Sequence, residues 1–288
     1  MAACMIERVL IVGTGLIGAS TGLAMRAAGF SGRIDGWDVS FLERAAALQM
    51  GAVDGVAADR EAALELARTA NVIVLAVPVL AIKDWMRLLA PVLQAGQLVT
   101  DVGSTKLEIL ELAAQLFGDT KAAFLAGHPM AGKESGGALL SEAGLFNGAM
   151  WLFTPTTTEP TAIEKEWRKW VGFFGARTLD MDAARHDELC AWVSHLPQML
   201  STALAALLED RFGDVPEIAA IGGRALRETT RLGASPYSMW RDVAMTNTEP
   251  IADTLLALEQ RLTHVRENLR TPGLREEFEL ANQFRKRH

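Results

Sequence analysis

The feature that most constrains how this chain folds is a glycine-rich hexapeptide, Gly13-Thr14-Gly15-Leu16-Ile17-Gly18. It directly follows an apolar run, Arg8–Val12, and opens an amphipathic stretch, Leu16–Ala28. In a chain with 25 glycines the G-x-G-x-x-G pattern alone carries little weight, but between a strand and a helix it is the fingerprint of dinucleotide binding. The first glycine permits a tight turn, the second lets the backbone approach a pyrophosphate, and the third lets helix and strand pack closely. The sequence therefore predicts a cofactor-binding loop made of Gly13, Gly15, Leu16, Ile17 and Gly18.

The first half of the chain alternates short apolar runs with helical patterns. The expected strands are Arg8–Val12, Arg33–Trp37, Asn71–Ala76, Gln97–Val102, Ala123–Ala126, Ala149–Phe153 and Arg177–Met181. The expected helices between them are Leu16–Ala28, Phe41–Met50, Ile82–Leu93 and Thr161–Phe174. Most of the strand runs are continuously apolar, which is typical of strands buried on both faces. The alternation predicts an α/β fold with a Rossmann-type, doubly wound and mostly parallel sheet.

From Asp182 onward the patterns are helical, with almost no strand signal. Residues Asp182–Asp210 are expected to form one long helix interrupted by Pro197, which lacks a backbone donor. We therefore predict two domains, an NAD-binding Rossmann domain at 1–181 and an all-helical domain for substrate binding and dimerisation at 182–288. The stretch Met199–Leu208 is too apolar for a small domain to bury alone, which favours a homodimer formed through the helices.

Composition excludes several classes of partner. The 288 residues carry a formal net charge of −7, so nucleic acid and anionic membranes are not expected to bind. Two cysteines, Cys4 and Cys190, make neither a disulfide framework nor a cysteine-rich zinc site, and they suit a reducing compartment. The longest strongly apolar run, Val72–Ile82, is too short to span a bilayer. We expect a cytoplasmic protein that binds a small molecule and no metal.

Asp38 follows the second expected strand, 25 residues after Gly13. A carboxylate there accepts hydrogen bonds from the adenosine 2′-hydroxyl and repels a 2′-phosphate, which favours NAD over NADP. The alternative is that Asp38 only caps the helix beginning near Phe41. Val77 and Pro78, just past the next buried strand, are expected to line the crevice that holds the cofactor.

Two further segments at strand ends carry chemistry-bearing residues. In Asp101–Lys106, Ser104 is placed to cap the next helix, a role compatible with one in the site. In Gly127–Gly136, Pro129 restricts the backbone of His128 and nearby glycines leave room for a ligand. A histidine held rigidly at a strand end is a suitable general acid or base.

These segments belong to a set of motifs that runs in order over nearly the whole chain. The set comprises Gly13–Gly18, Asp101–Lys106, Gly127–Gly136, His186-Asp187, Ser194-His195-Leu196-Pro197, Thr230-Arg231-Leu232, Pro236, Met239-Trp240-Arg241-Asp242 and Asn247. With these motifs the chain resembles the prephenate/arogenate dehydrogenase family of tyrosine biosynthesis. The resemblance implies oxidative decarboxylation of prephenate to 4-hydroxyphenylpyruvate, or of arogenate to tyrosine, with NAD(P) taking the hydride. It also implies that His128 is the catalytic histidine, with Ser104 hydrogen-bonded beside it, and that Arg231 holds the ring carboxylate.

Such a substrate carries a carboxylate, so a protein with a net negative charge must bind it through individual cationic side chains in the site. Arg224, Arg227 and Arg231 recur at i, i+3 and i+7 and share one helix face. Glu134 and Glu228 could pair with these arginines, orienting them or gating the pocket. The alternative is an ordinary solvated basic stripe. Trp240 either packs in the helical core or walls the pocket.

His195 and Gln198 lie three residues apart and can share a face of the interrupted helix. Many members of the family that the chain resembles carry histidine where Gln198 stands, at a position expected to meet the substrate side chain. This departure leaves the choice between the pyruvyl group of prephenate and the alanyl group of arogenate open. His186 and His195 are alternatively structural histidines.

The preferred interpretation is an NAD-dependent prephenate dehydrogenase. The nearest alternatives are an arogenate dehydrogenase and a dual-specificity cyclohexadienyl dehydrogenase. A dehydrogenase of another small acid, such as a β-hydroxyacid, is a more distant alternative because neither its expected motifs nor a candidate catalytic lysine in the helical half is found. A regulator that senses NAD without catalysis is disfavoured because His128, Ser104 and Arg231 are all retained.

Overall fold

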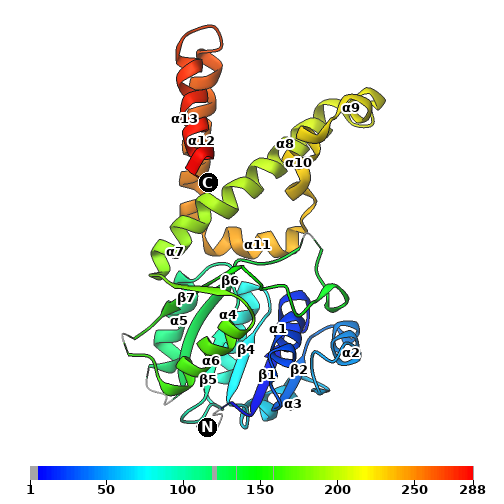
Figure 1. The fold of residues 1–288 in the computed structure, drawn as a ribbon, viewed down its shortest axis with the longest axis vertical. Helices are drawn as coiled ribbons and strands as arrows, with labels where there is room; N and C mark the ends of the chain where they lie inside the picture. The colour runs from blue at the N-terminus through cyan, green and yellow to red at the C-terminus, as the bar shows by residue number, and fades with distance from the viewer. Residues whose placement is uncertain (1–5, 119–121, 134, 158, 288) are drawn as a thin grey trace.

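The computed structural model describes residues 6–118, 122–133, 135–157 and 159–287. Figure 1 shows an α/β body formed by the N-terminal half of the chain and a group of helices that projects from one end of it. The predicted fold class, a doubly wound and mostly parallel sheet followed by a helical C-terminal part, is confirmed.

The body is built on an eight-stranded sheet in the order β3-β2-β1-β4-β5-β6-β7-β8. The strands are β1 (Arg8–Val12), β2 (Arg33–Trp37), β3 (Gly55–Val56), β4 (Val72–Leu75), β5 (Leu98–Asp101), β6 (Ala123–Pro129), β7 (Met150–Pro155) and β8 (Arg177–Asp180). Neighbouring strands are parallel except β6 and β7, which are antiparallel. The chain moves from β1 to β2 on one side and later returns to β4 on the other. This reversal leaves a crevice at the carboxyl ends of the central strands, where such sheets bind ligands.

Helices cover both faces of the sheet (Figure 1). They are α1 (Leu16–Ala27), α2 (Phe41–Gln49), α3 (Arg60–Ala67), α4 (Val79–Leu89), α5 (Leu107–Phe117), the short η1 (Ala138–Leu140) and α6 (Ala162–Phe173). Leu10 and Ile11, adjacent on β1, belong to two different buried apolar clusters. Because successive side chains of a strand point to opposite faces, a strand covered on both sides must be apolar at every position.

Three elements of the body were not predicted, β3, α3 and the short η1, and one helix begins earlier than expected. A strand of two residues is too short to show a period in the sequence. Helix α4 begins at Val79, immediately after Pro78, rather than at Ile82. Pro78 has an extended backbone at the N-cap position of α4, so the helix begins with the next residue, Val79.

The C-terminal part consists of helices. They are α7 (Ala183–Cys190), a π-helical turn η2 (Ala191–His195), α8 (Leu196–Phe212), α9 (Pro216–Ile221), α10 (Arg224–Thr230), η3 (Arg231–Ala234), α11 (Tyr237–Thr246), α12 (Thr248–Glu267) and α13 (Gly273–Arg287). The predicted interruption of the long helix is confirmed, and it takes the form of the wider π turn just before Pro197. Proline cannot donate to a carbonyl in the preceding turn, so the helical hydrogen bonding has to be rearranged there.

Two carboxylates of the helical part cap helices of the body. Asp187 accepts hydrogen bonds from the backbone N–H of Lys106 (2.8 Å) and of Leu107 (2.9 Å) at the start of α5. Asp242, on α11, accepts from the N–H of Leu80 (3.1 Å) in the first turn of α4. Both helix starts lack a side-chain cap from their own N-cap residue, so the body takes these acceptors from the helical part. The expectation that Ser104 caps the helix after β5 is wrong, because α5 begins at Leu107 and its cap comes from Asp187.

Large apolar side chains remain exposed on the projecting helices. Leu207 on α8 is 65% exposed, and other exposed side chains of this kind are Ile221, Leu262, Phe278 and Phe284. This agrees with the expectation that the region around Met199–Leu208 cannot bury its apolar face within one chain. Across the residues that the structure describes, no helix has both the length and the apolar character to cross a membrane.

Candidate active site

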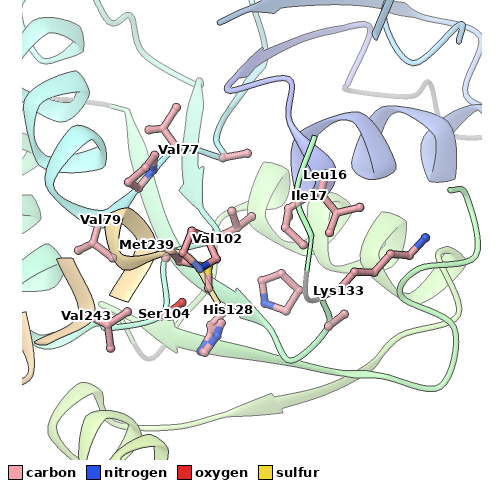
Figure 2. Close-up of a pocket in the computed structure, with 18 residues that line it drawn as sticks. Leu16, Ile17, Val77, Val79, Val102, Ser104, His128, Lys133, Met239 and Val243 are labelled. Atoms are coloured by element: carbon pink, nitrogen blue, oxygen red, sulfur yellow. The ribbon is translucent and has the colours of Figure 1, made fainter. Parts of the chain in front are cut away.

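A cavity of about 390 Å³ lies at the carboxyl ends of the central strands (Figure 2). Its wall combines segments that are far apart in the sequence. Leu16 and Ile17 of α1, Val77 to Val79 at the start of α4 and Val102 to Ser104 after β5 line one part of it. The rest of the wall is formed by His128 and Pro129 at the end of β6, by the loop residues Ala131, Gly132, Lys133 and Gly136, and by Pro236, Met239 and Val243 of the helical part. Leu16 and Ile17 of the glycine motif therefore line the same cavity as His128. This is the crevice that the strand order predicts.

The three glycines of the hexapeptide have different surroundings. Gly13 has a φ of +93°, and an added Cβ would lie 2.3 Å from the carbonyl oxygen of Ala76. At Gly18 a Cβ would lie 1.9 Å from the carbonyl oxygen of Gly13, so only glycine fits between α1 and the loop. At Gly15 a Cβ would meet nothing within 4 Å. Gly15 is also the N-cap of α1 and provides no side-chain cap, so the positive end of the helix dipole faces open space. The loop fits the pyrophosphate of a dinucleotide.

Asp38 lies directly beside this loop. One of its carboxylate oxygens accepts from the N–H of Thr14 (2.9 Å) and the other from the N–H of Ser40 (2.9 Å). The alternative that Asp38 only caps the next helix is wrong, because the N-cap of α2 is Ser40, whose hydroxyl accepts from the N–H of Glu43. Arg44 donates to the carbonyl oxygen of Asp38 (2.8 Å), which brings one cation close to the same position.

His128 is 8% exposed and reaches the cavity from the end of β6. Its Nδ1 lies 2.9 Å from Nε2 of His186 on α7, and Nδ1 of His186 lies 2.7 Å from a carboxylate oxygen of Asp187. His186 and Asp187 are themselves 0% and 2% exposed. Burial lowers the pKa of His128 well below its ordinary value, and the neighbouring His186 and Lys106 lower it further. His128 is therefore a neutral imidazole at neutral pH and can accept a proton.

A buried ion pair supports the strand ends behind His128. Lys106 and Asp101 are both fully buried and are joined by a hydrogen bond between the ammonium and the carboxylate. The ammonium of Lys106 also donates to the carbonyl oxygen of Gly127 (2.8 Å), next to His128 in the chain. Asp101 accepts in turn from the N–H of Gly103 (2.8 Å) and of Gly127 (3.3 Å). The pair thus fixes the carboxyl ends of β5 and β6, from which Ser104 and His128 reach the cavity.

Comparison with known proteins identifies the family. Residues 21–178 match the model of the prephenate dehydrogenase nucleotide-binding domain, and residues 182–285 match that of the prephenate dehydrogenase dimerization domain. The chain belongs to the prephenate dehydrogenase family. A prephenate dehydrogenase of Lactococcus lactis is 32% identical over 260 residues, which cover 90% of this chain and 70% of that protein.

Solved structures of this family superpose over the whole chain. The crystal structure of prephenate dehydrogenase from Aquifex aeolicus, in complex with hydroxyphenyl propionate and NAD+, has a TM-score of 0.84 at 27% identity and covers 98% of this chain and 96% of that one. The arogenate dehydrogenase of Synechocystis has a TM-score of 0.78 at 29% identity, with 97% and 99% covered. The likeness extends over the body and the helices, so the chain shares the arrangement of both parts with the prephenate dehydrogenase family.

The structure does not place the predicted arginine of the prephenate dehydrogenase family on the wall of the cavity. Arg231 begins η3 and is exposed, five residues before Pro236, which does line the cavity. The carboxylate of Glu228 pairs with Nε of Arg224 (2.6 Å), and both side chains are exposed. An exposed pair at i, i+4 contributes little to stability. Glu134, the other predicted partner of these arginines, lies outside the described residues.

Gln198, His195 and Trp240 also lie away from the cavity wall. Gln198 is buried, and its amide donates to the carbonyl oxygen of Leu232 (2.7 Å) and accepts from the hydroxyl of Ser235 (3.2 Å), so it fastens η3 to α8. His195 packs edge-on against Trp240 with ring centroids 5.9 Å apart. Burial lowers the pKa of His195 to about 4. In this conformation the three side chains organise the helical part.

The sequence analysis missed several residues of the site. Lys133 lines the cavity, donates to the carbonyl oxygen of Leu140 (2.7 Å) and pairs with Glu142, and Met239 and Val243 close the cavity from α11. His186 and Asp187 were noted only as a motif. Their adjacency in the sequence was visible, but the 58 residues that separate His186 from His128 conceal the contact between the two rings.

Proposed function

We propose that this protein is an NAD-dependent prephenate dehydrogenase that converts prephenate to 4-hydroxyphenylpyruvate and carbon dioxide. The observation that carries the proposal is that the neutral, buried His128 and the dinucleotide loop face one cavity. Gly13, Gly15, Leu16, Ile17 and Gly18 with Asp38, Val77 and Pro78 would hold NAD. Bound NAD would accept the hydride from the ring carbon that carries the hydroxyl group.

In the reaction His128 takes the proton of the ring hydroxyl, which strengthens electron release toward that carbon. The ring carboxylate leaves as carbon dioxide and its bonding electrons make the ring aromatic. The product is a phenol, so His128 returns the proton to the ring oxygen and none is consumed. Assistance of this kind typically contributes about 10²–10⁴ in rate. Ser104, which lines the cavity together with His128 (Figure 2), is proposed to orient the hydroxyl group.

The test is NADH formation measured in parallel with prephenate and arogenate. We expect turnover of both, with prephenate preferred. The amide of Gln198 is neutral and contacts Leu232 and Ser235 in this structure, so it offers no charge that would exclude either substrate side chain. Exclusive use of arogenate would make the protein an arogenate dehydrogenase. Turnover of neither substrate by folded protein that binds NAD would favour a sensing role.

We propose the same two domains as the sequence predicts, 1–181 for NAD and 182–288 for substrate and dimerisation. The match to a dimerization domain and the exposed apolar side chains of α8, α12 and α13 support a homodimer. A small anionic substrate suits the cavity, and neither nucleic acid nor a membrane is a proposed partner. With two cysteines in the chain, a reducing compartment, the cytoplasm, is proposed.

The first prediction concerns cofactor choice. NAD is expected to give a kcat/KM about 10-fold or more above that of NADP, roughly 1.4 kcal/mol, because the carboxylate of Asp38 repels a 2′-phosphate. Asp38→Ser is expected to narrow this preference, which steady-state kinetics with both cofactors will show. Equal or better turnover of NADP by the unaltered protein would contradict the role of Asp38 and direct attention to the nearby cation of Arg44.

The second prediction concerns the substrate carboxylate. Arg231→Lys keeps the charge but loses the planar fork that binds a carboxylate through two hydrogen bonds. We expect the KM for prephenate to rise by about 10-fold while NAD affinity stays unchanged. Arg227→Lys, on the preceding turn, is the control. If the KM changes only in the control, the anion site lies on α10 rather than at Arg231.

A further inference from the structure

The mechanism above leaves two fully buried polar side chains of the site without a task, His186 and Asp187. Both come from α7, in the helical part, whereas His128 comes from the sheet. The three residues form a continuous line of contacts, His128 Nδ1 to His186 Nε2 at 2.9 Å and His186 Nδ1 to Asp187 Oδ1 at 2.7 Å. A line of this kind has a direction, because each neutral imidazole has one nitrogen that donates and one that accepts.

The direction is set at Asp187. Its carboxylate already accepts from two backbone N–H groups, those of Lys106 and Leu107, at the positive end of α5. Two such donors and the helix dipole favour the ionised carboxylate, which can only accept. Nδ1 of His186 must therefore carry the proton and donate it. Nε2 of His186 is then an acceptor, so Nδ1 of His128 donates to it, and Nε2 of His128 remains without a proton.

Resting on the proposed function, we propose that His186 and Asp187 are positioning residues that hold His128 in the tautomer whose unprotonated Nε2 receives the hydroxyl proton of the substrate. The same two residues hold the ring plane, because Nδ1 of His128 is fixed by its hydrogen bond. When Nε2 takes the proton, the imidazolium keeps donating through Nδ1 to His186, and the carboxylate of Asp187 stabilises the positive charge. The proton returns from Nε2 to the ring oxygen as carbon dioxide leaves.

Other charged or titratable groups surround this line. The ion pair of Lys106 and Asp101 contacts Gly127, the residue before His128. His195 is the last residue of the π turn η2, which follows α7. Sγ of Cys190 is 3.6 Å from Nε2 of His186, and burial together with the charge of Asp187 raises the pKa of this thiol to about 12. His128, His186 and Cys190 together have the spacing of metal ligands. A thiol that keeps its proton is a poor metal ligand, and the hydrogen-bonded line accounts for both histidines.

The test combines Asp187→Asn with a matched control. Oδ1 of Asp187 accepts from both the N–H of Lys106 and Nδ1 of His186, and Oδ2 accepts from the N–H of Leu107. The introduced amide has a single oxygen and no charge, so it cannot accept from all three donors and no longer stabilises a positively charged imidazolium. Asp242→Asn is the control, because Asp242 is equally buried and caps α4 across the same contact between the two parts, yet touches neither histidine. We expect Asp187→Asn to lower kcat by about 10²- to 10³-fold with the Kd for NAD unchanged, and the control to retain kcat.

A second readout needs neither cofactor nor substrate. Nitrogen NMR of ¹⁵N-histidine-labelled protein reports which imidazole nitrogen carries the proton, and the His128 signals are assigned by their loss in His128→Asn. We expect protonated Nδ1 and unprotonated Nε2 in the unaltered protein and in the control, and a smaller share of this tautomer in Asp187→Asn. Protonated Nε2 in the unaltered protein, or an Asp187→Asn protein with unchanged tautomer and kcat, would overturn the proposal.

A pair of variants at His186 covers the case in which Asp187→Asn does not fold. Glutamine places an amide oxygen near the position of Nε2 and can accept from His128, whereas leucine cannot. We expect His186→Gln to keep most of the kcat that His186→Leu loses, and equal activities would overturn the proposal. If the unaltered protein turns over neither prephenate nor arogenate, the proposed function fails, while the tautomer measured by NMR still decides the role of His186 and Asp187.

Discussion

His128→Asn is expected to lower kcat by about 10²- to 10⁴-fold while the protein still folds and binds NAD and substrate. Asparagine keeps a hydrogen-bonding group at the end of β6 but takes up no proton in the working pH range. The measurements are kcat and KM for both substrates, with NAD binding followed by intrinsic fluorescence. Loss of substrate binding with kcat intact would make His128 a positioning residue.

The pH dependence checks the same assignment. In the proposed mechanism the neutral form of His128 is the active one, and burial lowers the pKa of His128, so the proposed base stays unprotonated as the pH falls through 6.5. We expect kcat/KM to be flat across neutral pH and to decline only well below pH 6.5. This decline should be absent from the residual activity of His128→Asn. A variant that retains both kcat and the decline would show that another group is the base, and His195 and His186 are then the next candidates.

Two glycines of the loop are expected to respond in opposite ways to the same substitution. Gly15→Ala should leave the melting temperature unchanged and raise the Kd for NAD by about 10- to 100-fold, roughly 1.4 to 2.8 kcal/mol, because the added methyl group enters open space where the pyrophosphate is expected. Gly18→Ala should lower the stability of the protein itself by about 1–3 kcal/mol or more, because the methyl group meets the backbone of Gly13.

Calorimetry and NAD titration of both variants separate the two effects. Gly29→Ala is a useful comparison for backbone strain alone, since Gly29 has a φ of +89° and nothing within 4 Å of an added Cβ. If Gly15→Ala binds NAD as tightly as the unaltered protein, the pyrophosphate does not approach the loop there. If Gly18→Ala keeps its full stability, the close contact between α1 and the loop is not needed for the fold.

The architecture could be predicted because the sheet imposes local patterns. Strands β1 and β2 were predicted at their observed bounds, because β1 appears in the sequence as a short apolar run and β2 follows the first helical stretch in the strand–helix alternation. The glycine motif was interpretable because its context, between β1 and α1, lies within twenty residues. His128 was recognisable as a candidate because it stands at a strand end, where this fold brings side chains to one edge.

The parts that could not be predicted depend on contacts between distant residues. The start of α5 is capped by Asp187, 80 residues later than Leu107, so local sequence suggested Ser104 instead. The prediction that Gln198 meets the substrate gave no sign that its amide contacts Leu232 and Ser235, which are more than thirty residues away. No period or capping rule records such partners, because they are chosen by how the helical part packs on the body.

Asp187 makes hydrogen bonds in both domains of the protein. Its carboxylate closes the first turn of a helix in the sheet domain, and it lies on a helix of the other domain beside the histidine that touches His128. The proposed general base and the residue that contacts it therefore come from two different domains. An isolated N-terminal half would keep the nucleotide loop and His128 but would lose both the cap and the ring's partner. We therefore expect a chimera that carries the helical half of a relative to be catalytically active only if that half supplies this carboxylate, however well each half folds.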